Sequence, residues 1–248
     1  FHAADPNPTY YRKLPSYGEY TVDEFRANAQ IDWVGMYQQN YGNLDKGAIY
    51  SVVEDVNKDK TLNVISHFDT KLKDNWKFNA NFSYQNLKSD NFRRIKDLLG
   101  ATFARNLDAY SNEGSNQWNL DNPDYKVYEG DRTQYSYILN KNTYAINLST
   151  EIDLPRWNVV ASVFASHSES YRDGQFRNHF YAVGNQSKGK SDVYNTTDAG
   201  MKAKVTYKID GKNFLVYTGA FFTLAPTLNE IFVNPRTTNL ITPEIQNM

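Results

Sequence analysis

Residues 76–85 alternate apolar and polar side chains without a break, and this pattern constrains the fold more than any other feature of the chain. Successive residues of a β-strand point to opposite sides of a sheet, so one face would carry Trp, Phe, Ala, Phe and Tyr, and the other Lys, Asn, Asn, Ser and Gln. Ten tilted strand residues rise roughly 24 Å, close to the apolar band of about 25 Å in an outer-membrane barrel. The pattern predicts a strand between an apolar and a polar medium.

The alternation recurs in pairs of segments that are joined by short connections. Three β-hairpins are expected, over residues 62–85, 144–165 and 199–222, with turns at residues 73–75, 154–156 and 209–213. In the third hairpin, Met201, Val205 and Tyr207 are expected to share a face with Phe214, Val216 and Phe222. The chain therefore predicts an all-β, antiparallel, up-and-down arrangement of about six strands.

Long polar stretches at residues 88–142 and 168–197 separate the hairpins. Short turns at one end and long loops at the other are typical of outer-membrane barrels, whose periplasmic turns are short. Each returning strand also opens on an aromatic residue, namely Trp76, Trp157 and Phe214, which predicts a periplasmic aromatic girdle. The alternative is that aromatic residues simply favour strands.

The faces of these strands give two sets of candidate residues. We expect the apolar set to face lipid: Leu62, Phe68, Trp76, Phe78, Phe82, Tyr144, Ile146, Trp157 and Val163. We expect the polar set to face the barrel lumen: Lys77, Asn79, Asn81, Asn147, Glu151, Lys202 and Lys204.

Composition excludes several other classes of protein. The chain has no cysteine, which excludes disulfide frameworks and thiolate metal sites, and its net charge of -1 argues against a nucleic-acid partner. A mean hydropathy of -0.70 and the lack of any run of about eighteen apolar residues argue against membrane-spanning helices. No low-complexity linker divides the chain, so residues 1–248 are expected to belong to one domain.

The polar stretches contain signals for short helices. Asp90 is expected to cap a helix over residues 92–99 that Gly100 closes, and Asp32 to cap a helix through Trp33 and Met36. Thr21 and Glu24 have the spacing of a capping box. These signals predict packed loops.

No residue pattern predicts catalysis, a cofactor or a metal site. His2, His67, His167 and His179 are scattered without ligand spacing, and the cluster Asp121, Asp124, Glu129 and Asp131 lacks the spacing of a calcium loop. No phosphate loop and no nucleophile with a nearby base occurs, so an enzyme is not expected. Three loop aromatics are candidates for contact with a polar ligand, or for packing between loops: Trp118, Tyr125 and Tyr128.

Residues 222–232 read Phe-Thr-Leu-Ala-Pro-Thr-Leu-Asn-Glu-Ile-Phe. This segment resembles the aromatic-x-Arg-Ala-Pro-Ser/Thr-Leu-Asn-Glu-Leu-Tyr stretch in the barrels of TonB-dependent outer-membrane receptors, with Leu224 where Arg is usual. Other stretches resemble a Bacteroidetes-type branch of that family: residues 1–6, 10–15, 97–101, 120–123, 171–174 and 234–236.

The resemblance implies a barrel of about twenty-two strands with an N-terminal plug, located in the bacterial outer membrane. It implies import of a scarce nutrient, such as a glycan or siderophore-bound iron, with energy relayed by TonB. The expected partners are outer-membrane lipid, the TonB complex acting through a plug and TonB box outside these residues, the nutrient, and a surface lipoprotein. The chain is expected to be an internal barrel segment that begins and ends in extracellular loops.

Two other hypotheses fit the strand pattern. One is a soluble β-sandwich that binds a carbohydrate through loop aromatics, in which the apolar faces form a core between two sheets. The other is a barrel of the porin type without a plug.

Overall fold

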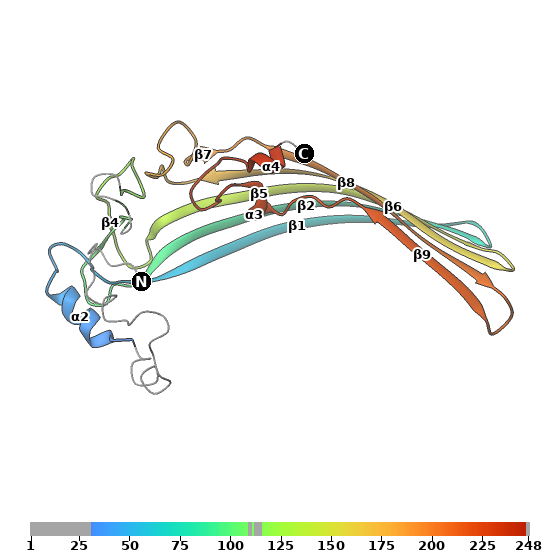
Figure 1. Cartoon of the computed structure of the whole chain (residues 1–248), viewed down its shortest axis with the longest axis horizontal. Coiled ribbons are helices and arrows are strands. Elements are labelled where there is room, and N and C mark those ends of the chain that lie inside the picture. Colours follow the sequence, from blue (N-terminus) through green and yellow to red (C-terminus); the bar gives the residue numbers. More distant parts are fainter. Residues whose placement is uncertain (1–30, 109–110, 112–115, 247–248) are drawn as a thin grey trace.

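The chain folds into one long antiparallel sheet in which each main strand neighbours the next one along the sequence. The computed structural model describes residues 31–108, 111 and 116–246. The strands lie in the order β1 (Val52–Lys73), β2 (Trp76–Asp97), β5 (Arg132–Asp153), β6 (Trp157–Gly174), β8 (Tyr194–Lys208) and β9 (Phe214–Phe222). The expected all-β class and antiparallel sheet are confirmed. Figure 1 shows that the sheet bends along its length into an open, curved wall.

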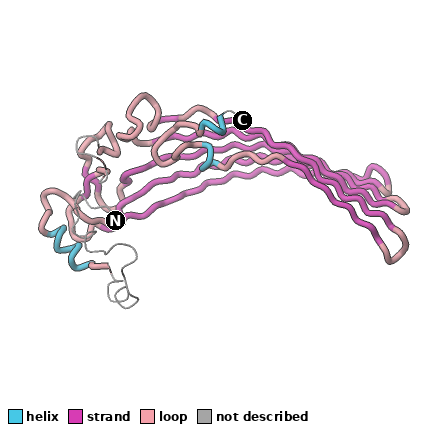
Figure 2. Tube along the Cα trace, viewed as in Figure 1, coloured by secondary structure: helices cyan, strands magenta, loops and turns pink. Residues whose placement is uncertain are grey.

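Shorter elements lie toward one end of this wall or over the sheet (Figure 1). Strand β7 (Gly189–Lys190) pairs with β6, and β3 (Ala104–Arg105) pairs with β4 (Lys126–Val127) in a separate ribbon. The helices are α2 (Trp33–Tyr41), α3 (Leu228–Ile231) and α4 (Pro243–Gln246). The loops gather at one end and the three short turns at the other (Figure 2). Within the described residues, no helix has the length and apolar character needed to cross a membrane.

The strands are longer than the alternating segments that predict them, since β1, β2 and β5 each contain 22 residues. The expected loops at residues 88–142 and 168–197 are therefore too long. The true connections between the main strands are residues 98–131 and 175–193. The alternation of apolar and polar residues ends where loops cover the sheet. The backbone N–H and C=O groups there still need partners, so hydrogen bonding between the strands continues.

The expected helix over residues 92–99 is wrong. Strand β2 continues through these residues, with Phe92 opposite Val56 and Ile95 opposite Val53. Asp90 does not cap a helix, because its carboxylate accepts two hydrogen bonds from Arg132, at 2.9 and 2.7 Å. Backbone hydrogen bonding with the neighbouring strands thus outweighs the local preference for a helix.

The expected helix after Asp32 is confirmed. The Asp32 Oδ1 atom accepts a hydrogen bond from the Gly35 N–H at 2.8 Å, which satisfies an orphan donor of the first turn. Met36 is buried and packs with Tyr50 and Leu99. The capping-box signal at Thr21 and Glu24 lies outside the described residues, as do His2 and the stretches 1–6 and 10–15.

The register separates the two sets of strand residues cleanly. Residues directly opposite each other in neighbouring strands point to the same side of a sheet. Along one row Phe82 lies opposite Ile146, and along the next Asn81 lies opposite Asn147. The nine apolar candidates occupy one face, which we call the apolar face, and the seven polar candidates occupy the other, the polar face.

The third hairpin is an exception, because the faces expected for β9 are reversed. Lys208 lies opposite Phe214, and Met201 lies opposite Phe221. Leu215, Tyr217 and Phe221 therefore belong to the apolar face, whereas Phe214, Val216 and Phe222 belong to the polar face. The turn sets this register, since Ile209 N–H donates to the Asn213 carbonyl at 3.0 Å. Phe214 thus does not share a face with Trp76 and Trp157; instead Tyr207 contacts Trp157, with ring centroids 4.6 Å apart.

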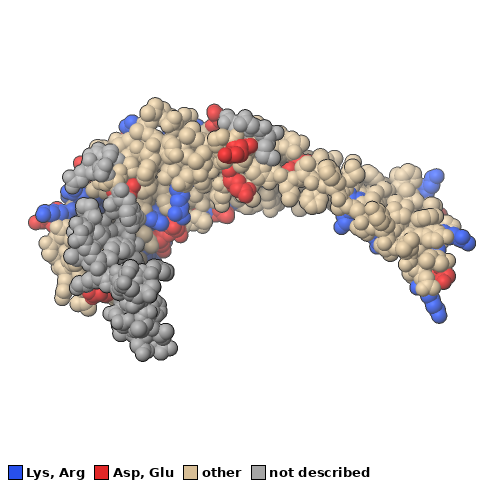
Figure 3. Space-filling model, viewed as in Figure 1, with Lys and Arg blue, Asp and Glu red and all other residues tan. Residues whose placement is uncertain are grey.

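The buried core lies at the loop end of the sheet. Three clusters of buried apolar side chains occur there, and they include Ile95, Leu98 and Val127 in the first, Tyr137 and Ile231 in the second, and Met36 in the third. Near the turns, by contrast, large apolar side chains stay exposed. Figure 3 shows Lys and Arg side chains at the turn end and also in the loop region, where Asp and Glu side chains lie among them.

Gly174 provides a test of the loop packing. A Cβ atom at Gly174 would lie 1.8 Å from the Ser187 carbonyl oxygen, so Gly174→Ala should displace residues 175–193. We expect a loss of about 1–3 kcal/mol of stability, as for other overpacked sites, and faster proteolysis of this loop. Gly211→Ala is the matched control, since a Cβ there meets no atom within 4 Å. Equal thermal unfolding of the two variants would contradict this packing.

Candidate functional site

The chain after β9 crosses back over the polar face of the sheet. Residues 223–246, which we call the return segment, contain α3 and α4 and lie over the middle strands (Figure 1). Ile231 and Phe232 are 1% and 2% exposed and pack on Tyr135, Tyr137 and Leu139 of β5. Burying two such side chains contributes about 1.5–3 kcal/mol each, so they anchor the segment on the sheet.

A local hydrogen bond shapes the start of the return segment. The Thr227 N–H donates to the Glu230 carboxylate at 2.7 Å, as in a capping box. This hydrogen bond holds the pKa of Glu230 below its ordinary value. Further along, the Thr242 N–H donates to the Ile231 carbonyl at 2.8 Å, which folds the segment back on itself.

Arg172 ties the return segment to a loop of the sheet. Its side chain is 1% exposed, and its Nε donates to the Pro235 carbonyl at 2.6 Å. Its Nη1 donates to the Ser187 carbonyl at 2.9 Å and also to the Asn239 Oδ1 atom. The guanidinium lies 5.1 Å from the Tyr137 ring centroid. One buried cation thus holds both the loop at residues 175–193 and the return segment.

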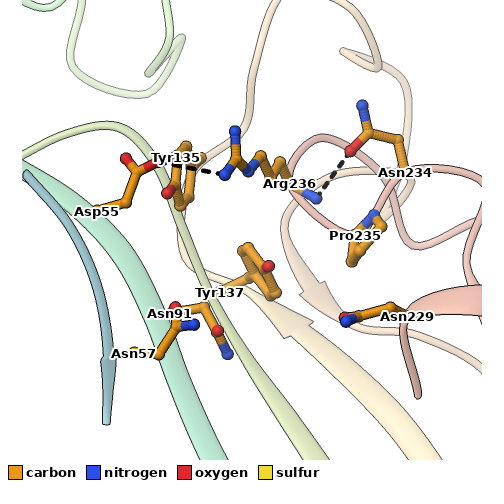
Figure 4. Close-up of a pocket in the computed structure, with 9 residues that line it drawn as sticks. All are labelled: Asp55, Asn57, Asn91, Tyr135, Tyr137, Asn229, Asn234, Pro235 and Arg236. Carbon is orange, nitrogen blue, oxygen red and sulfur yellow. Dashed lines mark hydrogen bonds and ion pairs between the residues drawn. The ribbon is translucent and has the colours of Figure 1, made fainter. Parts of the chain in front are cut away.

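A pocket of about 370 Å³ opens between the return segment and the polar face. Strands β1, β2 and β5 contribute one side, and the return segment contributes the other (Figure 4). Its lining is polar and aromatic: Asp55, Asn57, Asn91, Tyr135, Tyr137, Asn229, Asn234, Pro235 and Arg236.

Charged groups meet at one end of the pocket. Asp55 accepts from Arg93 twice, Nε to Oδ1 at 2.6 Å and Nη2 to Oδ2 at 3.1 Å, and from Arg236 Nη2 at 3.2 Å. The Tyr135 ring contacts both cations, since its centroid lies 5.4 Å from the Arg93 Cζ and 4.7 Å from the Arg236 Cζ. The guanidinium groups are thereby held in place by a carboxylate and an aromatic ring.

Neutral polar groups line the rest of the pocket. Asn57 and Asn229 carry amides, and Tyr137 carries a hydroxyl beside its ring (Figure 4). Amides and hydroxyls both donate and accept hydrogen bonds, and a ring gives an apolar contact surface. The arrangement suits a small ligand that carries many polar groups.

The predicted loop aromatics do not line this pocket. Trp118 packs edge-on against His179 and Phe180, with centroids 5.6 and 5.5 Å away, whereas Tyr125 and Tyr128 are exposed. Ligand contact by these three residues stays a prediction.

The acidic loop residues mostly accept hydrogen bonds from other loop residues. Asp121 accepts from Arg177 at 2.7 Å and from Lys188 at 2.6 Å, and the hydrogen bonds from Lys188 and Arg177 hold the pKa of its carboxyl below the ordinary value. Asp131 accepts from the Tyr128 N–H at 2.9 Å. Within the described part of the chain, no group of three or more His, Asp or Glu side chains could hold a metal ion.

Sequence reasoning missed the pocket residues. None of the seven predicted lumen-facing residues lines it, although Asp55 and Asn57 continue the same polar face further along β1. The alternation from Asn63 to Lys71 could have been extended to them. In the sequence, residues 234–236 carry only a resemblance to a family motif, and nothing local predicts that they lie over β5.

A scan against protein-family models and searches of curated proteins and of solved structures found no match for this chain. The functional assignment therefore depends on its own residues and geometry.

Arg172 gives a test of how the return segment is held. Arg172→Lys keeps the charge but places all donors on one nitrogen, so it cannot reach Pro235, Ser187 and Asn239 together. We expect a loss of about 3 kcal/mol and faster proteolysis within residues 223–246, because hydrogen bonds to charged groups contribute about 1.5–3 kcal/mol each. The exposed Arg105→Lys is the control. Equal protection of the segment in both variants would contradict the proposed role.

Proposed function

We propose that this chain forms part of the barrel wall of an outer-membrane TonB-dependent receptor that binds and imports a scarce nutrient. One observation carries the proposal: a meander of long strands has an apolar face and a polar face, with short turns at one end and long loops at the other. Large side chains on the apolar face are solvent-exposed, including Leu62 at 58% and Met201 at 61%. Lipid contact would remove this apolar surface from water.

The proposed membrane band covers the parts of the strands nearest the turns. The nine residues on the apolar face then contact lipid, and the seven on the polar face line the lumen. Trp76, Trp157 and Tyr207 lie near the turn end of the apolar face, where an aromatic girdle would meet the periplasmic interface. The outer edges of β1 and β9 then pair with further strands, since bilayer hydrocarbon does not tolerate open sheet edges.

The partners follow from this placement. The lumen holds the plug, through which the TonB complex supplies energy, and the nutrient enters from the loop end. The exposed aromatics of the loops, Tyr125 and Tyr128 among them, offer a surface for a lipoprotein outside the cell. The resemblance of residues 222–232 favours a plugged receptor over a porin.

A soluble β-sandwich fits the observations less well. In a sandwich a second sheet would cover the apolar face and bury its side chains. Phe68 and Phe82 instead remain 57% and 48% exposed.

Charge insertion tests the proposal in the full-length protein in its native membrane. Phe82→Arg places a guanidinium on the apolar face near the expected midplane, where it should cost about 2–4 kcal/mol or block assembly. Asn81→Arg, one residue away on the polar face, should be tolerated. Assembly is measured as heat-modifiable, membrane-embedded protein after cell fractionation.

The water-exposed alternative makes the opposite prediction. If the apolar face met water, Arg would be accommodated at residue 82 as readily as at residue 81. Equal assembly of both variants, or recovery of the native protein in the soluble fraction, would contradict an outer-membrane barrel.

A further inference from the structure

We propose that the pocket under the return segment binds an anionic group, a carboxylate, sulfate or phosphate, of a small hydroxyl-rich molecule, and that Arg236 is its direct partner. The charge preference follows from the pocket alone. That the molecule is the imported nutrient rests on the function proposed above.

Arg93 uses all three of its side-chain nitrogen atoms in hydrogen bonds within the protein. Its Nε and Nη2 atoms bind both oxygens of Asp55, and its Nη1 atom donates to the Gln134 Oε1 atom at 2.5 Å. Its side chain is only 18% exposed. A planar guanidinium matched to a carboxylate in this way neutralises it, so Asp55 and Arg93 together carry no net charge.

Arg236 is the remaining cation at the pocket. Its side chain is 52% exposed, and its guanidinium makes one hydrogen bond in the described structure, the 3.2 Å contact with Asp55. A guanidinium has five N–H donors, so most of them are not used by hydrogen bonds within the described structure. With Asp55 matched by Arg93, one positive charge is left over for a ligand.

Arg236 is also held in position before any ligand arrives. The Asn234 Oδ1 atom accepts from the Arg236 backbone N–H at 3.1 Å, and Arg172 holds the carbonyl of Pro235 at 2.6 Å. The Tyr135 ring supports the guanidinium at 4.7 Å. A preorganised cation loses little conformational entropy when it binds an anion.

The neutral lining completes the match to a hydroxylated molecule. Among the described contacts, the side-chain amides of Asn57 and Asn229 and the hydroxyl of Tyr137 make no hydrogen bond within the protein, although all three residues line the pocket. They can bind hydroxyl groups of a ligand whose anionic group lies against Arg236. The volume of about 370 Å³ is at the low end of the range for small-molecule pockets.

Binding to the full-length protein, purified in detergent, tests this inference. Isothermal titration calorimetry would compare D-glucuronate and D-glucose 6-phosphate with D-glucose. We expect each anionic sugar to bind at least about tenfold more tightly than glucose, as one charge-assisted hydrogen bond allows. Inorganic sulfate should compete with both, which shows that the anionic group itself is recognised.

The variants separate Arg236 from a general effect of charge. Arg236→Gln should remove the preference for the anionic sugars, whereas Arg156→Gln, at an exposed turn of the opposite end of the sheet, should leave it unchanged. Equal binding of charged and neutral sugars, or a preference that survives Arg236→Gln, would overturn the inference. Because binding is measured in detergent, this result is independent of the membrane assay with Phe82→Arg, and either proposal can fail alone.

Discussion

The backbone ladder between neighbouring strands is the constraint on which the rest of the molecule depends. Pairing extends along nearly the whole length of β1, β2 and β5, with register shifts at Val52/Val53, Lys71/Lys73 and Phe92/Arg93, and it fixes which side chains share a face. Once Phe82 lies opposite Ile146, every second residue along those strands must follow it to the same side. The apolar face and the polar face on the opposite side of the sheet are thus both consequences of how the strands pair.

The return segment converts part of that polar face into a site. Strand β9 ends at Phe222, opposite Gly200, whereas its neighbour β8 extends toward the loop end as far as Tyr194, so the residues after Phe222 lie beside the sheet and not within it. Apolar anchors at Ile231 and Phe232 bring the segment down on β5, and the polar residues around them are left facing β1 and β2. The pocket therefore forms between the sheet and the chain that leaves it after a short strand.

The sequence could predict whatever depends on near neighbours in the chain. The alternation at residues 76–85 and the cap at Asp32 each report a local geometry, and both correspond to what the structure contains. The helix predicted after Asp90 is wrong because pairing with β1 and β5 is stronger than a local preference. The prediction for β9 is wrong because the turn before it determines which of its residues lie on each face of the sheet. The pocket joins residues from four parts of the chain, so no local pattern marks it.

Two arginines with opposite surroundings explain why the pocket keeps its shape. Arg172 is buried, and among the described residues no carboxylate forms an ion pair with it. A buried cation is costly unless several oxygens accept its hydrogen bonds, and Pro235, Ser187 and Asn239 provide them. Arg236 follows directly after Pro235, so the carbonyl that Arg172 holds belongs to the peptide bond that leads into Arg236. The buried cation thereby sets the position of the exposed one. A change at Arg172 should therefore alter the pocket through that peptide and through the Tyr137 ring, which the Arg172 guanidinium also contacts.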